Sequence, residues 1–156
     1  MGKLIHTLAE LDVEAARFIA GLAIKEGGAT LITLSGDLGA GKTAFTKSVA
    51  HSLGVEEIVN SPTFVLEKIY LIPGRGHRVS SGHSVSTPFK RLVHIDAYRL
   101  ESGSDLTPLG FDELMQDSGN LILLEWPEKV ADALPVPTIR ISIAPLPDGS
   151  RTISYD

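Results

Sequence analysis

The sequence predicts a three-layer α/β fold whose mixed sheet is parallel at its centre and antiparallel at its edges. The runs 29–35 and 121–125 are apolar without a polar face, as expected for strands that are covered on both sides. Helical patterns alternate with these runs, and a hairpin pattern closes the chain. A length of 156 residues favours a single domain over residues 1–156.

The remaining elements follow in a regular order. Apolar residues recur at helical spacing from Asp12, a good N-cap, to Ile24, and Gly27-Gly28 ends this helix. Further predictions are a helix over 42–53, strands over 63–71 and 91–97, short helical turns over 104–116, and a hairpin of 139–143 and 151–155 around Pro147-Asp148-Gly149. The segment 72–90 is rich in Gly, Ser, His, Pro and Arg, so we expect a flexible insertion or lid there.

Composition and charge exclude several classes of protein. The chain has 19 acidic and 14 basic residues, so its net charge is −5, which argues against direct electrostatic binding of nucleic acid. No cysteine is present, which excludes disulfides, thiolate metal sites and a cysteine nucleophile. The apolar stretches are about four residues long, far short of a membrane span, and no secretory signal pattern is present. We expect a cytoplasmic protein without membrane contact.

A phosphate-binding motif lies between a predicted strand and a predicted helix. Residues Gly36-Asp-Leu-Gly-Ala-Gly-Lys-Thr43 satisfy the pattern G-x-x-x-x-G-K-[ST] in full. Glycines let successive backbone N–H groups point toward phosphate oxygens, and the N-terminus of the following helix adds positive charge. Lys42 supplies a point charge to the β- and γ-phosphates, and the Thr43 hydroxyl is placed to ligate Mg²⁺. We therefore predict a P-loop NTPase-like domain that binds a nucleotide.

Two carboxylates at strand ends are candidates for the magnesium partner that a P-loop requires. Asp96 ends the apolar run 92–96, and Glu125 ends the run 121–125. Each could instead cap the following turn. Because both could converge on one sheet edge, we expect at least one of them to serve the metal.

A separate candidate, for a residue that senses the γ-phosphate, is Thr63 with its hydroxyl, in the segment Ser61-Pro-Thr-Phe64. In P-loop switch proteins, a hydroxyl in this region can reach the γ-phosphate or its metal and sense hydrolysis. The residues alone favour the plainer interpretation, a Ser-Pro turn that leads into a strand.

Taken together, these motifs resemble the TsaE (YjeE) family of bacterial P-loop ATPases, which serve the threonylcarbamoyladenosine (t6A) modification of tRNA. The chain carries, in the family's order and spacing, the P-loop, the Ser-Pro-Thr-Phe segment, His94-Ile-Asp-Ala-Tyr-Arg-Leu100, Leu109-Gly-Phe-Asp-Glu-Leu114 and Glu125-Trp-Pro-Glu128. The segment 72–90 departs from the family by its greater length.

The resemblance implies a role for each matching residue. Leu38, Gly39, Ala40, Gly41, Lys42 and Thr43 would wrap the phosphates of ATP, and Thr43 with Glu125 would hold Mg²⁺. Asp96 would lie near the γ-phosphate and orient water or the metal's hydration shell, with Lys42 and the switch hydroxyl of Thr63 completing the catalytic set. Asp12 and Gly149 match family positions close to the nucleotide. Tyr98, Arg99 and Trp126 belong to the family's motifs, as partner surface or as packing.

The resemblance also implies partners. An ATPase of low intrinsic activity would drive or reset the TsaB–TsaD heterodimer and would meet tRNA only indirectly, which agrees with the acidic composition. Two other functions stay open: a small-molecule kinase that uses 72–90, with Arg75 and Arg78, as its lid, and a switch that binds ATP without hydrolysing it.

Overall fold

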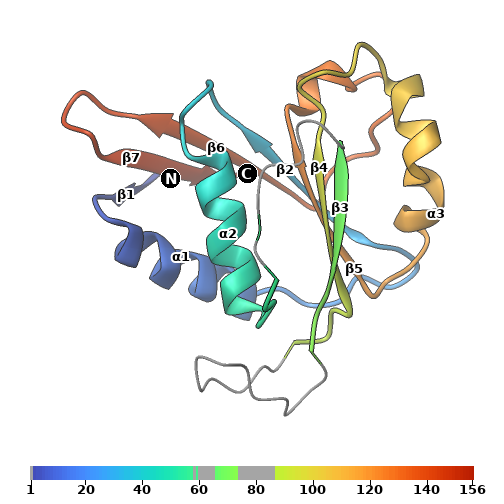
Figure 1. Cartoon of the computed structure of the whole chain (residues 1–156), viewed down its shortest axis with the longest axis horizontal. Coiled ribbons are helices and arrows are strands. Elements are labelled where there is room, and N and C mark those ends of the chain that lie inside the picture. Colours follow the sequence, from blue (N-terminus) through green and yellow to red (C-terminus); the bar gives the residue numbers. More distant parts are fainter. Residues whose placement is uncertain (1, 58, 60–65, 74–86) are drawn as a thin grey trace.

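Seven strands in the described part of the chain form one sheet with the order β1-β7-β6-β2-β5-β4-β3 (Figure 1). The computed structural model describes residues 2–57, 59, 66–73 and 87–156. The strands are β1 (Gly2–Ile5), β2 (Thr30–Ser35), β3 (Glu67–Leu71), β4 (Arg91–Asp96), β5 (Asn120–Glu125), β6 (Ile139–Pro145) and β7 (Arg151–Tyr155). The helices are α1 (Leu8–Ala20), α2 (Lys42–Ser52) and α3 (Phe111–Met115), with 3-10 turns η1 (Gly103–Leu109) and η2 (Pro127–Lys129).

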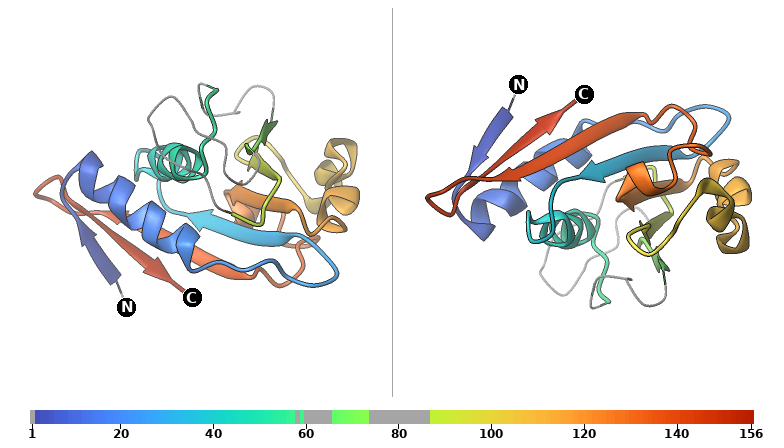
Figure 2. Two further views of the ribbon diagram at one scale, coloured as in Figure 1. Left: turned by 90° about the horizontal axis from the view of Figure 1, so that it is seen from below. Right: turned by 90° about the horizontal axis from the view of Figure 1, so that it is seen from above.

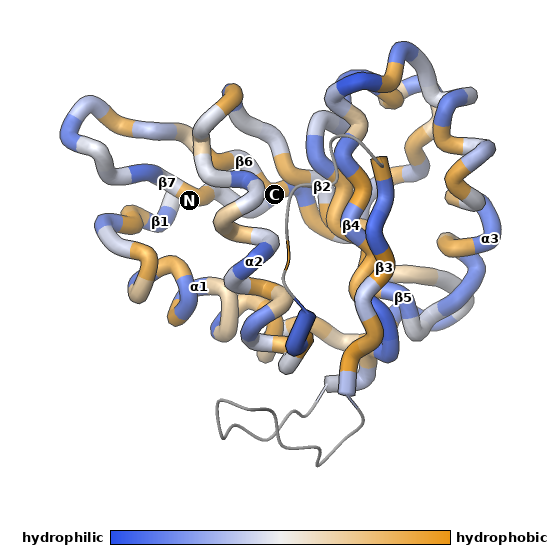
Figure 3. The backbone as a smooth tube through the Cα atoms, viewed as in Figure 1, coloured by the Kyte–Doolittle hydropathy of each residue, from blue (hydrophilic) through white to orange (hydrophobic). Residues whose placement is uncertain are grey.

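The sheet is mixed, as the sequence predicted. The pairs β2–β5, β2–β6 and β4–β5 are parallel, whereas β1–β7, β6–β7 and β3–β4 are antiparallel. Every residue of β5 is buried, as are all residues of β2 except the half-buried Ser35. Figure 3 shows the same pattern, because the hydrophobic segments gather in the central strands. Strands buried on both faces need no polar side, which is why these two runs lack one.

Helices cover both faces of the sheet, so the predicted three layers are confirmed. One hydrophobic core joins α1 and α2 to strand residues such as Leu121 and Leu123. A second core joins η1 and α3 to Ile122 and Leu124, whose side chains point to the opposite face. The two chain ends lie near each other at the β1–β7 edge (Figure 2).

The N-terminal region differs from the prediction. Helix α1 begins at Leu8 because Thr7 and Glu10 form a capping box, in which the Thr7 hydroxyl accepts from the Glu10 N–H at 3.1 Å. The prediction that Asp12 caps this helix was therefore wrong, and the helix ends at Ala20, well before Ile24. Strand β1 was not predicted at all. Three of its four residues are exposed, so its sequence lacks the pattern of a buried strand.

The other predicted elements lie within a few residues of their expected bounds. The helix after the P-loop ends at Ser52, the strand before Asp96 begins at Arg91, and the hairpin turns at Pro147-Asp148-Gly149. Of the predicted strand 63–71, residues 67–71 form β3. Residues 63–65 lie outside the described part of the chain, as do residues 74–86 of the predicted insertion. None of the described helices is long and apolar enough to cross a membrane.

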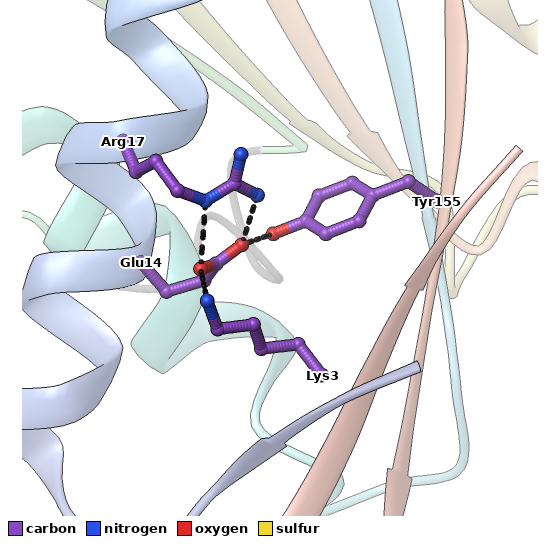
Figure 4. Close-up of polar contacts among 4 residues, drawn as sticks. All are labelled: Lys3, Glu14, Arg17 and Tyr155. Atoms are coloured by element: carbon purple, nitrogen blue, oxygen red, sulfur yellow. Dashed lines mark hydrogen bonds and ion pairs between the residues drawn. The ribbon is translucent and has the colours of Figure 1, made fainter. Parts of the chain in front are cut away.

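A buried carboxylate ties the N- and C-terminal strands to α1. Figure 4 shows Glu14, which is 2% exposed, among Lys3, Arg17 and Tyr155. The Arg17 Nε and the Tyr155 hydroxyl donate to its two oxygens at 3.0 Å and 2.5 Å, and the Lys3 ammonium lies at 3.4 Å. The hydrogen bond from Arg17 is the largest cause that lowers the pKa of Glu14, from 4.5 to about 2, although burial opposes it.

We expect Glu14→Gln to destabilise the protein at neutral pH and less so in acid. The fall of the Glu14 pKa corresponds to a contribution of roughly 3 kcal/mol to the free energy of unfolding. Because Lys3 and Arg17 are more than half exposed, solvent screens part of this interaction. We therefore expect Glu14→Gln to lower the free energy of unfolding by about 1–2 kcal/mol at neutral pH. A lowered pKa stabilises the fold above pH 4.5, and this gain is lost between pH 4.5 and about 2.

Urea unfolding of both proteins at pH 7, 5, 4 and 3.5 measures this effect. The difference in free energy of unfolding should shrink as the pH falls below 4.5. The exposed Glu26 provides a matched control, since Glu26→Gln should change stability little. A difference that stays constant with pH would contradict the assignment.

Candidate functional site

The phosphate-binding motif forms a turn between the buried strand β2 and helix α2. Gly41 is the N-cap of α2 with a φ of +111°, a conformation that residues with a Cβ rarely adopt. A Cβ at Gly41 would overlap the guanidinium of Arg151, and one at Gly36 would approach the Ile143 carbonyl oxygen to 2.5 Å. At Gly36 close packing against the backbone therefore requires glycine, whereas at Gly41 the backbone conformation requires it, because the long Arg151 side chain can move.

Lys42 is held at the start of α2 by its own loop. Its side chain is 5% exposed, and its ammonium donates hydrogen bonds to the carbonyl oxygens of Gly36 and Asp37, the latter at 3.0 Å. The ammonium also lies 4.1 Å from the centre of the Trp126 ring, within the range of a cation–π contact. A positive charge is thus fixed at the centre of the glycine-rich turn.

Two buried carboxylates lie at the ends of neighbouring parallel strands. Asp96 and Glu125 are direct partners in the β4–β5 register and are 4% and 2% exposed. Asp96 accepts a hydrogen bond from the Tyr98 N–H at 3.0 Å, which fixes one of its oxygens. The expectation that both strand-end acids converge on one sheet edge is confirmed.

An aromatic pair borders the same edge. The rings of Tyr98 and Trp126 are 5.0 Å apart, and Trp126 adopts a left-handed conformation with a φ of +61°. Bulky residues seldom occupy this region, so the turn after β5 is held there by its contacts, one of which is the Trp126 N–H to the Leu34 carbonyl at 3.3 Å. This conformation places the indole ring of Trp126 next to the Lys42 ammonium.

These groups line one open cleft of about 290 Å³. Its lining residues are Leu38, Gly39, Gly41, Lys42, Thr43, Ala44, Asp96, Tyr98, Glu125 and Trp126. The cleft therefore contains seven residues that the sequence predicted for the site: Leu38, Gly39, Gly41, Lys42, Thr43, Asp96 and Glu125. Sequence reasoning left Tyr98 and Trp126 undecided between partner surface and packing, and both line the cleft.

The other predicted site residues lie elsewhere. Ala40 is a buried residue of the turn itself, and Asp12 lies on α1, where its carboxylate accepts a hydrogen bond from the Ser48 hydroxyl at 2.6 Å. Gly149 lines a smaller pocket of about 100 Å³ with Arg151, the residue that packs on Gly41. Thr63 lies outside the described residues.

Two residues of the site were not found from the sequence. Arg151 reaches the P-loop from β7, and His94 contacts Glu125 from β4. The first contact joins segments about a hundred residues apart, and no local motif signals it. The second follows from the parallel pairing of β4 with β5, which the sequence suggested without giving the register.

The donor set fits a magnesium ion that is shared with a nucleotide. The Thr43 hydroxyl and the carboxylates of Asp96 and Glu125 are oxygen donors at one cleft, and Mg²⁺ prefers oxygen. In the described part of the chain, no group of three or more acidic, histidine or cysteine side chains forms a complete metal cage. Mg²⁺ is commonly bound by one or two carboxylates, with phosphates and water as further ligands, so this small set is sufficient.

Comparisons with known proteins agree over nearly the whole chain. A family model described as "Threonylcarbamoyl adenosine biosynthesis protein TsaE" matches residues 6–153. The protein named tRNA threonylcarbamoyladenosine biosynthesis protein TsaE in Treponema pallidum is 37% identical over 136 residues, which cover 87% of each chain. Its namesake in Bacillus subtilis is 38% identical over 128 residues, 80% of this chain and 68% of the relative.

The fold has a solved counterpart as well. The crystal structure of YdiB from Bacillus subtilis resembles this structure with a TM-score of 0.70 at 29% sequence identity. The match covers 99% of this chain and 83% of YdiB. The mixed sheet with its parallel centre is therefore an architecture that an experimental structure also has.

Proposed function

The chain belongs to the TsaE family, and on that premise we propose that it is a Mg²⁺-dependent ATPase that supports t6A modification of tRNA. The observation that carries this proposal is the single cleft in which a P-loop, its lysine and two strand-end carboxylates meet. A P-loop alone indicates a nucleotide and no reaction. The carboxylates add the groups that hydrolysis requires, namely a metal ligand and a group that can orient water.

The phosphates of ATP would lie along the turn 36–43. Backbone N–H groups of the turn and the N-terminus of α2 would donate to phosphate oxygens, since the Gly41 cap has no side chain to occupy them. Lys42 would exchange its bonds to the loop carbonyls for bonds to the β- and γ-phosphates, which are stronger because both partners are charged.

The two carboxylates would have different tasks. Thr43 and Glu125 would hold Mg²⁺, which when bound offsets the negative charge of the triphosphate. Asp96, with one oxygen fixed by the Tyr98 N–H, would orient the attacking water or the water around the metal. Thr63 remains the predicted switch hydroxyl.

The family suggests that this hydrolysis serves a partner complex. We propose that ATP turnover drives or resets the TsaB–TsaD heterodimer, and that tRNA is met through these partners. A net charge of −5 supports an indirect contact, because direct binding of tRNA would need clustered basic side chains. The seven strands found in the described residues join one sheet, which supports the view that residues 1–156 act as one ATPase domain.

Release of phosphate from ATP, measured with and without TsaB and TsaD, tests this function. We expect a low rate for the chain alone and a marked increase when both partners and Mg²⁺ are present. Nucleotide-dependent binding of the partners without any phosphate release would favour a switch that does not hydrolyse ATP. Phosphoryl transfer to a small metabolite without the partners would favour a kinase.

A further inference from the structure

His94 is a buried histidine that the roles above do not use. It lies in β4 with no exposed surface, and its Nε2 is 2.5 Å from Oε2 of Glu125 on the neighbouring strand β5. His94 and Asp96 are two positions apart and therefore share one face of the sheet, as do Leu123 and Glu125. The histidine thus lies directly beneath the two acids of the cleft.

The charge on Glu125 decides which of the two groups donates this hydrogen bond. When Glu125 is ionised, as a metal ligand must be, an unprotonated Nε2 would place its lone pair against a carboxylate oxygen. Nε2 therefore carries the proton and donates to Glu125. The other ring nitrogen, Nδ1, is buried and has no hydrogen-bond partner in the described part of the chain, so a proton there would be an unsatisfied donor.

The hydrogen bond uses one carboxylate oxygen and leaves the other available to the cleft. The side chain of Glu125 is almost fully buried, and its contact with His94 restrains the position of the carboxylate. An apolar residue would pack at position 94 without the cost of burying an imidazole, as Val93 and Ile95 do in the same strand. The imidazole therefore needs a role other than filling the core.

We propose that His94 is a positioning residue that orients the Glu125 carboxylate for the metal that accompanies the nucleotide. This inference rests on the proposed function, because it assumes that Glu125 binds Mg²⁺. Residues that hold a metal ligand by a hydrogen bond commonly contribute 10- to 100-fold, in order of magnitude, to metal affinity. We expect an effect of about this size from His94.

The test compares substitutions at His94 by their effect on metal dependence. His94→Leu removes the donor and puts an apolar side chain of similar size in place of the imidazole. His94→Gln can place an amide N–H near the position of Nε2, whereas His94→Asn is too short to reach Glu125. For each variant, calorimetry gives the affinity for a non-hydrolysable ATP analogue in EDTA and across a Mg²⁺ titration, and electron paramagnetic resonance gives the binding of Mn²⁺.

We expect His94→Leu and His94→Asn to raise the Mg²⁺ and Mn²⁺ half-saturation about 10- to 100-fold, with affinity in EDTA within about twofold of the parent. His94→Gln should recover most of the loss. Leu92→Ala is the matched control, since it weakens the same strand without touching Glu125 and should leave the metal half-saturation unchanged. If His94→Leu does not fold, the comparison of His94→Asn with His94→Gln carries the test.

Two failures can be distinguished. If the parent protein binds the analogue with a clear dependence on Mg²⁺ and the variants show the same half-saturation, the role of His94 is overturned and the proposed function stands. If the parent shows no dependence on Mg²⁺, the proposed function fails first. A loss of metal affinity in Leu92→Ala equal to that in His94→Leu would also overturn the inference, because general destabilisation would explain both.

Discussion

Replacing Lys42 by alanine is expected to reduce partner-stimulated phosphate release by at least about 100-fold, the scale on which removal of one preorganised donor acts. The ammonium is the positive side chain fixed inside the glycine-rich turn, where it is 5% exposed and already bonded to the loop. In this partly desolvated position its attraction for phosphate is screened less than at the surface. The loss should therefore affect both nucleotide affinity and turnover.

Phosphate release in the presence of TsaB, TsaD and Mg²⁺ measures this effect. Lys47→Ala is the matched control, because Lys47 is on the same helix with its side chain in solvent. It removes the same charge from the protein and should leave the rate within about twofold. Persistence of the stimulated rate in Lys42→Ala would show that hydrolysis occurs without the P-loop.

Glu125→Gln is expected to have the second large effect. The substitution keeps the shape of the side chain and its contact with His94, and removes the charge that a hard cation needs. We expect phosphate release to fall by about 100-fold. Nucleotide affinity in EDTA should be retained or increased, since a negative charge beside the phosphates has been removed.

The comparison of affinities with and without Mg²⁺ separates a metal ligand from a structural acid. Glu113 lies exposed on α3, and Glu113→Gln provides the control for a neutralised carboxylate outside the cleft. If Glu125→Gln lowered nucleotide affinity equally in Mg²⁺ and in EDTA, Glu125 would act on the fold of the cleft and not on the metal.

Features that depend on local sequence could be predicted, and the P-loop is the clearest example. The strand, turn and helix around Lys42 follow from consecutive residues, so their bounds agree with the structure to within about a residue. The start of α1 was missed because Asp12 resembles a cap, while the capping box of Thr7 and Glu10 fixes the true start five residues earlier. Thr7 and Asp12 are both good N-cap residues, and the sequence alone did not show which of them begins the helix.

The sheet's parallel centre could be predicted, but individual contacts between distant segments could not. Strand β1 is stabilised by pairing with β7 at the other end of the chain, and its own residues are mostly exposed. The contacts of Arg151 with Gly41 and of His94 with Glu125 arise in the same way, from the sheet register. The strand-end positions identified the acids of the cleft, the family resemblance gave each of them a role, and the register of β4 on β5 adds the histidine beneath them.

The central claim is that the turn 36–43, with Lys42 and a divalent cation, binds the triphosphate of ATP. Titration calorimetry of the purified chain with a non-hydrolysable ATP analogue and Mg²⁺ tests it most directly. The account predicts a saturable heat for one site, weakened when EDTA replaces Mg²⁺ and lost in Lys42→Ala. A folded protein that gives no heat of binding with or without Mg²⁺ would contradict it.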